Sequence, residues 1–306
     1  MGKHVGMIKS LFKRALTAVG ILAVATSPIA AAHARARNAG PALWQVSDRD
    51  TTIYLFGTIH LLPKNSSWRT AKFEQAVQKS QGLVLETLID TANPAQLAGL
   101  MAQMGFASGL PPIASRVAPE KAPLLEAAIA KTKLPRPVFD RMETWAAAFT
   151  LLGVQFQTLG VEGEQGVENV LRQQFTQQGK QVGELESNRQ QLGFFDTLPE
   201  KAQRELLEGA IENPVQARAK FNGMLNAWLT GNVDEIGRTF NEDLQGSPDL
   251  RNALLTRRNY NWSQWIERRM AQPGTVMVAV GAGHLAGKES VQRYLQSRGY
   301  KVKRLQ

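Results

Sequence analysis

The chain has 306 residues, 36 lysines and arginines against 26 acidic residues, a formal net charge of +10 and no cysteine. The lack of cysteine excludes disulfide bonds, thiol catalysis, thiolate metal sites and a lipoprotein anchor. The length suffices for one large domain with a substantial core, and that core must stabilise the protein without covalent help.

The first 34 residues have the pattern of a secretory signal peptide. Four basic residues precede an uncharged stretch from Ala15 to Ala25, and small residues follow as far as Ala34. We expect cleavage after Ala34, which leaves a periplasmic or secreted domain over residues 35–306 with a net charge of +6. An uncleaved anchor is the alternative, but the apolar stretch is shorter than the roughly 20 residues of a transmembrane helix. No second spanning segment follows, so we expect no stable membrane insertion after cleavage.

The region after residue 34 begins with a sequence pattern typical of β-strands. Residues 43–46 and 52–56 are short apolar runs around a polar turn, which predicts a β-hairpin. A helix is expected over residues 68–80, with Ser66 or Ser67 as its N-cap.

The rest of the chain predicts an α/β fold with a mixed central sheet, flanking helices and a helical insertion. Residues 94–159 are rich in Ala, Leu and Met at helical spacing and are broken by prolines, which predicts a helical subdomain over one side of the sheet. The other expected elements are strand 82–86, helix 166–178, strand 181–185, helices within 199–270, strand 275–280, helix 289–298 and strand 300–305.

Two histidines, His60 and His284, are the only ones beyond the leader, which contains His4 and His33. Each closes a Gly-x-x-His motif directly after an apolar run, at the point where a strand gives way to a loop. An α/β protein places reactive side chains at such points, and imidazole there can bind metal or transfer protons near neutral pH. A structural histidine is the alternative for either one.

Glu86 follows the strand over 82–86 and completes a candidate metal site. Two imidazoles and a carboxylate can hold a divalent ion, with an open position for water, if His60, Glu86 and His284 end neighbouring strands. The same ligand set also suits iron, so these residues do not fix the metal. A solvent-facing glutamate is the alternative for Glu86, and Glu186 is a weaker candidate of the same kind.

The basic residues do not indicate a nucleic-acid-binding protein. Arg257, Arg258, Arg268 and Arg269 are interspersed with aromatic residues, but at helical spacing such a stripe is typical of a core-facing helix. Export also removes the protein from nucleic acid, so we expect none as a partner.

Several of these segments together resemble the TraB/PrgY/GumN family, over essentially the whole mature chain. The resemblance rests on Pro-Ala-Leu-Trp-Gln-Val at 41–46, Tyr-Leu-Phe-Gly-Thr-Ile-His-Leu-Leu-Pro at 54–63, Leu-Val-Leu-Glu at 83–86 and Val-Ala-Val-Gly-Ala-Gly-His-Leu-Ala-Gly at 278–287. Arg258-Asn259 and Glu186 with Gln191-Leu192 also match the family's pattern.

The resemblance implies a fold related to the erythromycin-esterase and ChaN-like group. It also implies a metal-dependent hydrolase similar to the animal Tiki proteases, which use manganese or cobalt; zinc is a further possibility for this chain. His60, Glu86 and His284 correspond to the metal or catalytic set, and Arg258 to a charged partner that stabilises an oxyanion or holds the glutamate. Glu168 stands where the family often has aspartate, which leaves the role of that position open.

The expected function is therefore that of an exported peptidase that acts on peptide or protein substrates. Two alternatives stay open. One is a binding protein that sequesters haem, metal or peptide without cleaving it, and the other is a metal-free, esterase-like hydrolase in which a histidine activates water.

Overall fold

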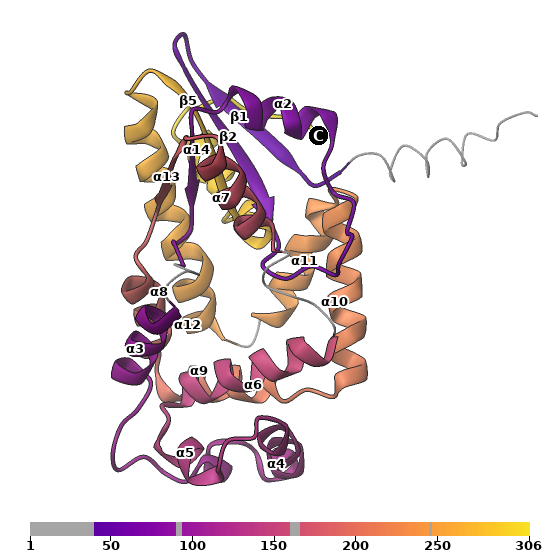
Figure 1. Ribbon diagram of the computed structural model, residues 1–306, viewed down its shortest axis with the longest axis vertical. Helices are drawn as coiled ribbons and strands as arrows, with labels where there is room; N and C mark the ends of the chain where they lie inside the picture. Colours follow the sequence, from indigo (N-terminus) through magenta and orange to yellow (C-terminus); the bar gives the residue numbers. More distant parts are fainter. Residues whose placement is uncertain (1–39, 90–93, 160–165, 245–246) are drawn as a thin grey trace, which may run out of the picture. The chain divides into compact units, whose positions relative to one another are not determined.

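A mixed six-stranded sheet forms the centre of the computed structural model, which describes residues 40–89, 94–159, 166–244 and 247–306 (Figure 1). The strands lie in the order β4, β3, β5, β2, β1, β6. Their bounds are β1 Leu43–Ser47, β2 Thr51–Thr58, β3 Gly82–Leu85, β4 Gln181–Glu184, β5 Gly274–Gly281 and β6 Val302–Arg304. The predicted fold class, α/β with a mixed central sheet and flanking helices, is confirmed.

The order of the strands brings the two Gly-x-x-His segments together. β5 pairs in parallel with β2 on one side and with β3 on the other, and β3 also pairs in parallel with β4. β1 is antiparallel to β2, as predicted for a hairpin. Thr58 at the end of β2 lies opposite Gly281 at the end of β5. Because parallel strands end at the same edge of a sheet, the residues that follow β2, β3, β4 and β5 all emerge at one carboxyl edge.

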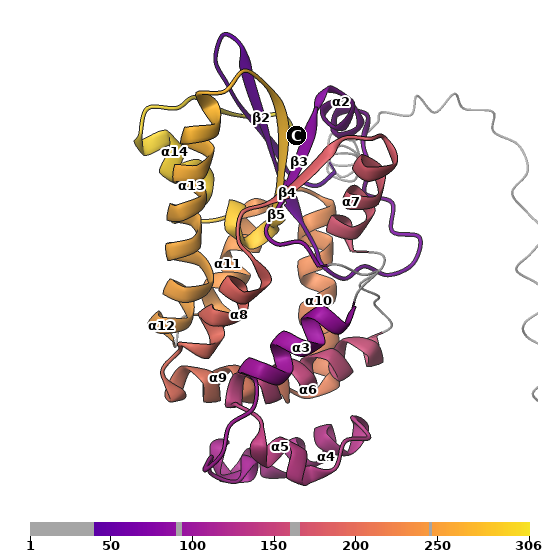
Figure 2. The same ribbon diagram turned by 60° about the vertical axis from the view of Figure 1, so that its left-hand side comes forward.

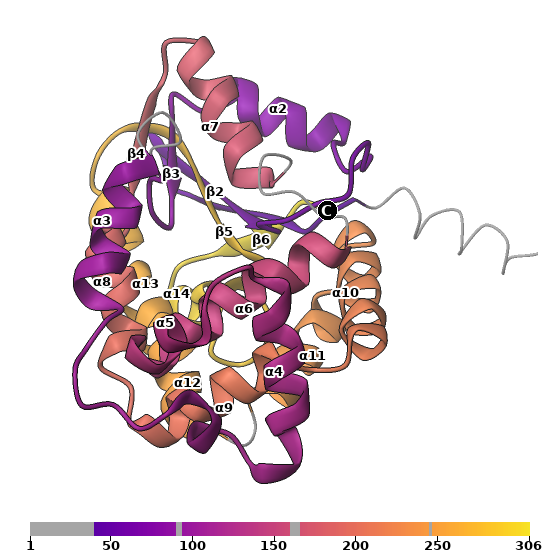
Figure 3. The ribbon, with the colours of Figure 1, turned by 60° about the horizontal axis from the view of Figure 1, so that its bottom comes forward.

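Alternating side chains of β2 enter two apolar layers, one on each face of the sheet. Tyr54 and Phe56 belong to one layer, and Ile53 and Leu55 belong to the other. Figure 3 shows α2 and α7 on one side of the sheet and α13 and α14 on the other. The helices of the first layer are α2 Ala71–Lys79, α7 Val167–Gln177, α10 Pro214–Leu229 and α11 Val233–Asp243, and those of the second are α13 Arg257–Met270 and α14 Val291–Ser297.

Helix α2 begins later than the sequence predicts. Its N-cap is Thr70, whose Oγ1 accepts a hydrogen bond from the N–H of Phe73 at 3.2 Å. The hydroxyl of Ser66 donates to a backbone carbonyl in the preceding turn. Trp68 is buried against Phe73, with ring centroids 5.0 Å apart, so core packing holds this segment as a loop. The predicted cap at Ser66 or Ser67 is wrong for that reason.

The helical insertion builds a core of its own. Among the described residues, its buried cluster includes Trp145 and Leu207 but contains no residue of a strand. The insertion lies beyond one end of the sheet (Figures 1 and 2), contrary to the prediction that it covers a sheet face. Its helices are α3 Pro94–Met104, α4 Ala122–Lys131, α5 Arg136–Arg141 and α6 Thr144–Leu159, with 3₁₀ turns at Ile113–Arg116 and Pro119–Lys121, and it packs on α9 Glu200–Ala210.

Helix α8, Asn188–Asp196, follows β4 and is an element that the sequence analysis missed. Ser187 accepts from the N–H of Gln190, and the Gln190 side chain accepts from the N–H of Ser187, which makes a capping box. Farther along, α12 (Pro248–Arg251) and a π-helical turn (Asn252–Thr256) lead into α13.

The leader predicted for residues 1–34 lies outside the described residues. Among the residues that the structure describes, no helix is both long and apolar enough to cross a membrane.

Candidate functional site

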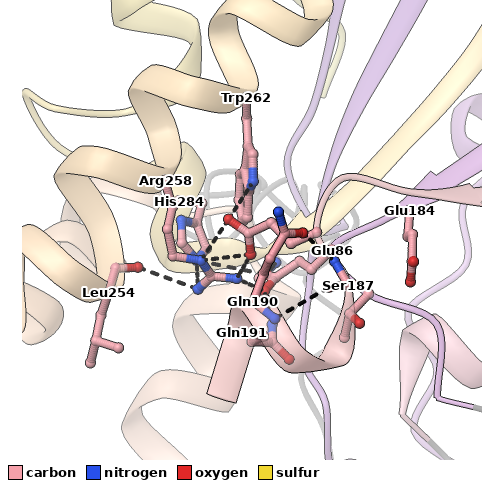
Figure 4. Close-up of polar contacts among 12 residues, drawn as sticks. Glu86, Glu184, Ser187, Gln190, Gln191, Leu254, Arg258, Trp262 and His284 are labelled. Atoms are coloured by element: carbon pink, nitrogen blue, oxygen red, sulfur yellow. Dashed lines mark hydrogen bonds and ion pairs between the residues drawn. The ribbon is translucent and has the colours of Figure 1, made fainter. Parts of the chain in front are cut away.

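Buried charged side chains gather at the carboxyl edge of the sheet, among them Glu86 and Arg258 (Figure 4). Glu86 follows β3, and Glu186 lies beyond β4. The N–H of Glu186 donates to the carbonyl of Glu86 at 2.9 Å, so the backbone pairing of β3 and β4 continues as far as these two residues. His284 lies in the 3₁₀ turn Ala282–Leu285 that follows β5. His60 follows β2 and is exposed.

Glu86 is almost completely buried, with 5% of its surface exposed, and both of its oxygens accept hydrogen bonds. Oε1 accepts from the N–H of Gly281 at 2.6 Å. Oε2 accepts from Nη2 of Arg258 at 2.7 Å and from Nε2 of Gln191 at 3.3 Å. Burial raises the pKa of Glu86, but the neighbouring imidazole and guanidinium groups and the Gly281 N–H outweigh it and lower the pKa to about 2. Glu86 is therefore a carboxylate at neutral pH.

Arg258, from the first turn of α13, joins the two buried carboxylates. Its Nε donates to both oxygens of Glu186 at 3.2 and 3.0 Å, and its Nη2 donates to Glu186 at 2.9 Å as well as to Glu86. Nη1 is 3.4 Å from the carbonyl of Leu254 in the π-helical turn. Trp262 completes the cluster, because its ring lies under the guanidinium and its Nε1 donates to Glu186 at 2.9 Å. One positive charge thus lies between two buried carboxyl groups, and burial still raises the pKa of Glu186.

His284 is buried, and its tautomer follows from its partners. Nδ1 lies 2.6 Å from Oδ1 of Asn259, whose Nδ2 donates to the carbonyl of Glu289. Because that bond fixes the amide orientation of Asn259, Oδ1 is the acceptor and Nδ1 of His284 carries the proton. Nε2 then holds a lone pair, which faces Nη1 of Arg258 at 3.3 Å and Oε1 of Glu86 at 3.7 Å. Burial lowers the pKa of His284 to about 3, so the imidazole is neutral.

His60 is held by a carboxylate from another helix. Its Nδ1 lies 2.8 Å from Oε1 of Glu168, in the first turn of α7, while 68% of the His60 side chain is exposed. The hydroxyl of Thr58 also donates to Glu168. The Glu168 carboxylate raises the pKa of His60 to about 9. Glu168, whose role the sequence left open, therefore orients one of the two motif histidines.

The structure brings His60, Glu86 and His284 together around Gly281. An atom in the position of a Cβ on Gly281 would be 3.1 Å from Oε1 of Glu86, 3.6 Å from Cδ2 of His284 and 3.8 Å from Nε2 of His60. Both histidines are held through Nδ1. Nε2 of His284 lies 3.7 Å from Oε1 of Glu86, and Nε2 of His60 faces the same side of Gly281 as that oxygen. Arg258 is as deeply buried as Glu86, contacts it through Nη2 and belongs to the same cluster.

The partners that hold these side chains were not predicted from the sequence. Asn259 and Gln191 were part of a resemblance only, and Glu168 and Trp262 had no assigned role. The capping box at Ser187 is a local signal that could have placed α8 and hence Gln191. The contacts of Asn259, Glu168 and Trp262 join distant parts of the chain, and no local pattern indicates them.

The fold and this cluster define a class: an α/β protein with two Gly-x-x-His segments on neighbouring parallel strands and a buried Glu, Arg and Glu group between them. The chain belongs to the TraB/PrgY/gumN family, whose model matches residues 42–304. It is 25% identical over 247 residues to the uncharacterized protein YbaP of Escherichia coli strain K12, and equally to YbaP of Shigella flexneri. Each alignment covers 79% of this chain and 87% of the relative. No solved structure matches the chain with statistical significance.

Proposed function

We propose that this protein is a metal-dependent hydrolase that cleaves peptide or protein substrates at the site formed by His60, Glu86 and His284. One observation carries the proposal: each histidine is held through Nδ1, by Glu168 or Asn259, and both rings lie beside Gly281 together with the Glu86 carboxylate. A bond at Nδ1 fixes the ring of a metal-binding histidine and directs Nε2 at the ion. An ion here would have to replace the contact of His284 Nε2 with Arg258 and the second proton of His60, whose pKa is about 9.

The donor types fit a divalent ion such as manganese, cobalt or zinc, which two Nε2 atoms of histidine and one oxygen of Glu86 would hold. Among the described residues, however, no three His, Cys, Asp or Glu side chains are already grouped closely enough to enclose an ion. Arg258 supplies the positive charge between Glu86 and His284 in this arrangement. A bound ion would polarise the scissile carbonyl and lower the pKa of a water molecule.

The side chains themselves suggest a division of roles. Glu86 is ionised and can hold a proton donor or orient a water molecule. His60 is exposed and paired with Glu168, so it can exchange a proton with a substrate at the surface. Arg258 has its three nitrogens engaged by Glu86, Glu186, Leu254 and His284, which suits a positioning residue that holds the glutamate better than an oxyanion stabiliser.

The pairing of His60 with Glu168 also orients the ring as the second candidate requires, a metal-free hydrolase in which an imidazole activates water. Because the pKa of His60 is about 9, this mechanism should be most active in alkaline solution, where the imidazole is neutral. In either case we propose that the protein acts outside the cytoplasm after removal of residues 1–34. A binding protein without catalysis would use the same side chains, so activity and metal content must be measured separately.

The deciding experiment combines metal analysis with peptide cleavage. The purified mature protein should contain or take up one divalent ion and cleave members of a peptide library. His60→Ala and His284→Ala should lose both properties, and Glu86→Gln should lose cleavage while keeping part of the metal, because one ligand of three is weakened. Glu184→Gln is the matched control, since Glu184 ends β4, is exposed and points away from the cluster (Figure 4).

Three outcomes separate the candidates. Cleavage without metal, resistant to chelators and dependent on His60, would replace the metal-dependent mechanism by the metal-free one. Metal uptake with no cleavage of any peptide or ester would make the protein a binder. Wild-type cleavage by all three variants would mean that the site lies elsewhere.

A further inference from the structure

An apolar pocket of about 190 Å³ opens beside the candidate site. It lies where the ends of β2 and β5 meet helices α6, α10 and α11. Gly281 and His60 belong both to its wall and to the site described above. Its apolar lining includes Ile59, Leu61, Phe221, Met224, Trp228 and Ile236.

The polar groups on the pocket wall are nearly all engaged. Nε1 of Trp228 donates to the carbonyl of Gly57 at 2.8 Å, and the hydroxyl of Thr58 donates to Glu168. Among the described residues that line the pocket, His60 is the one ionisable side chain, and it stands at the end nearest Glu86. The pocket thus offers apolar surface to a ligand, with a proton-exchanging group at one end.

We propose that this pocket binds a bulky apolar group of the substrate, next to the bond that is cleaved. The inference rests on the proposed hydrolase function and specifies its substrate class. A dry cavity of about 150 Å³ holds one benzene molecule, so this pocket accommodates an aromatic ring or a branched aliphatic chain. Away from His60, the apolar lining disfavours a charged or strongly polar group, because the side chains there offer no hydrogen-bond partner to offset its loss of water.

The position of the pocket explains why such a group would matter for the reaction. A ligand group inside the pocket reaches Gly281, and the position of a Cβ on Gly281 is within 4 Å of Glu86, His284 and His60. Binding there would hold the neighbouring carbonyl close to the three side chains. An apolar substrate group would therefore act through positioning as well as affinity.

Two measurements test the pocket, one with turnover and one without. The first is kcat/KM for 4-nitrophenyl acetate, butyrate and hexanoate, which should rise about fourfold for each added methylene until the pocket is full. The second is titration of the wild-type protein with benzyl alcohol, which has no bond to hydrolyse, followed by ligand-observed NMR.

Met224→Trp is the test variant, because a larger side chain at this position in α10 fills the pocket without touching the charged cluster. It should bind benzyl alcohol at least tenfold more weakly and lose the preference for hexanoate. Asn226→Trp is the matched control: Asn226 is exposed on the same helix and does not line the pocket, so both measurements should match wild type. Met224→Ala enlarges the pocket and should shift the preference toward longer esters. It is the test variant to use if Met224→Trp does not fold.

The outcomes distinguish this proposal from the hydrolase proposal. Benzyl alcohol binding that Met224→Trp weakens, with no hydrolysis by wild type, would support the pocket and contradict the hydrolase. Hydrolysis that is indifferent to acyl length, or binding that neither Met224 variant alters, would overturn the pocket while leaving the hydrolase in place. Failure of benzyl alcohol to bind wild type would overturn the pocket as well.

Discussion

Arg258 brings one positive charge to two buried carboxylates, and its loss should destabilise the protein. Arg258→Met would leave Glu86 and Glu186 buried without their cation, and breaking a buried ion pair in this way costs about 3 to 5 kcal/mol. Urea unfolding at neutral pH should show a loss of that size. Arg257→Met is the control, since Arg257 is exposed and should change the free energy of unfolding by less than about 0.5 kcal/mol. Equal stability of the two variants would show that the buried cluster is not formed.

His60 offers a direct test of the pairing with Glu168. The carboxylate favours the protonated imidazole, so the pKa of His60 lies at about 9, above the ordinary value of 6.5. Glu168→Gln removes that negative charge and should lower the pKa toward its ordinary range. An NMR pH titration of a protein that comprises residues 35–306, in the presence of a chelator, can measure both, because that part of the chain contains only His60 and His284. A wild-type His60 that titrates near 6.5 would contradict the pairing.

The same titration should distinguish the two histidines. Burial lowers the pKa of His284 to about 3, so its signals should stay those of a neutral ring across the range in which His60 titrates. The folded protein binds a proton at His284 less readily than the unfolded chain does. Its contribution to stability is therefore present above pH 6.5 and is lost as the pH falls toward 3. Glu86 acts in the same sense, between the ordinary glutamate pKa of 4.5 and its own pKa of about 2.

At the end of β5, a side chain at position 281 would crowd the residues of the candidate site. Gly281→Ala would place a methyl group 3.1 Å from Oε1 of Glu86, closer than a relaxed contact allows. We expect hydrolysis to fall roughly ten- to hundredfold, because the glutamate and the loop must shift. Gly153→Ala in α6 is the contrast, since no atom lies within 4 Å of the added methyl group there. That variant should gain about 0.5 to 1 kcal/mol in unfolding measurements, and unchanged activity in Gly281→Ala would contradict the crowding at β5.

Elements with a strong periodic pattern were predicted well, and their ends were not. β2 was expected over 52–56 and spans Thr51–Thr58, because an unbroken apolar run identifies a buried strand wherever it stops. The cap of α2 was misplaced because burial of Trp68 overrides the local preference of Ser66. Helix α8 was missed because its apolar positions are few and its only clear signal is the capping box.

At the scale of the whole molecule, the sequence indicated which residues would meet but not what would hold them. His60, Glu86 and His284 each follow an apolar run, and parallel strands bring such positions to one edge. The Asn259 bond to His284 and the Glu168 bond to His60 depend on how helices pack on that edge, which no spacing along the chain reveals. The position of the helical insertion was mispredicted for the same reason. Its apolar side chains pack against one another and against α9, not against the sheet.

The leader prediction also concerns the whole molecule. If residues 1–34 are removed on export, the mature protein begins at Arg35 and is recovered without membrane. Intact-mass spectrometry of the exported protein, with fractionation of the cells, measures both. A product that keeps residues 1–34 and sediments with membranes would support the uncleaved anchor, and Ala34→Arg should be processed poorly if the cut lies there.

The place of β5 in the sheet has a consequence for how the protein matures. β5 comes from the last part of the chain, yet it lies between β2 and β3 and contacts both. A chain still emerging from the ribosome or an export channel therefore lacks the middle of its sheet until residue 281 has appeared. The site cannot assemble earlier, because Gly281 and His284 arrive with the same segment. A chain that stops before residue 281 thus lacks the central strand of the sheet and two residues of the candidate site, and we expect it to be open to proteolysis.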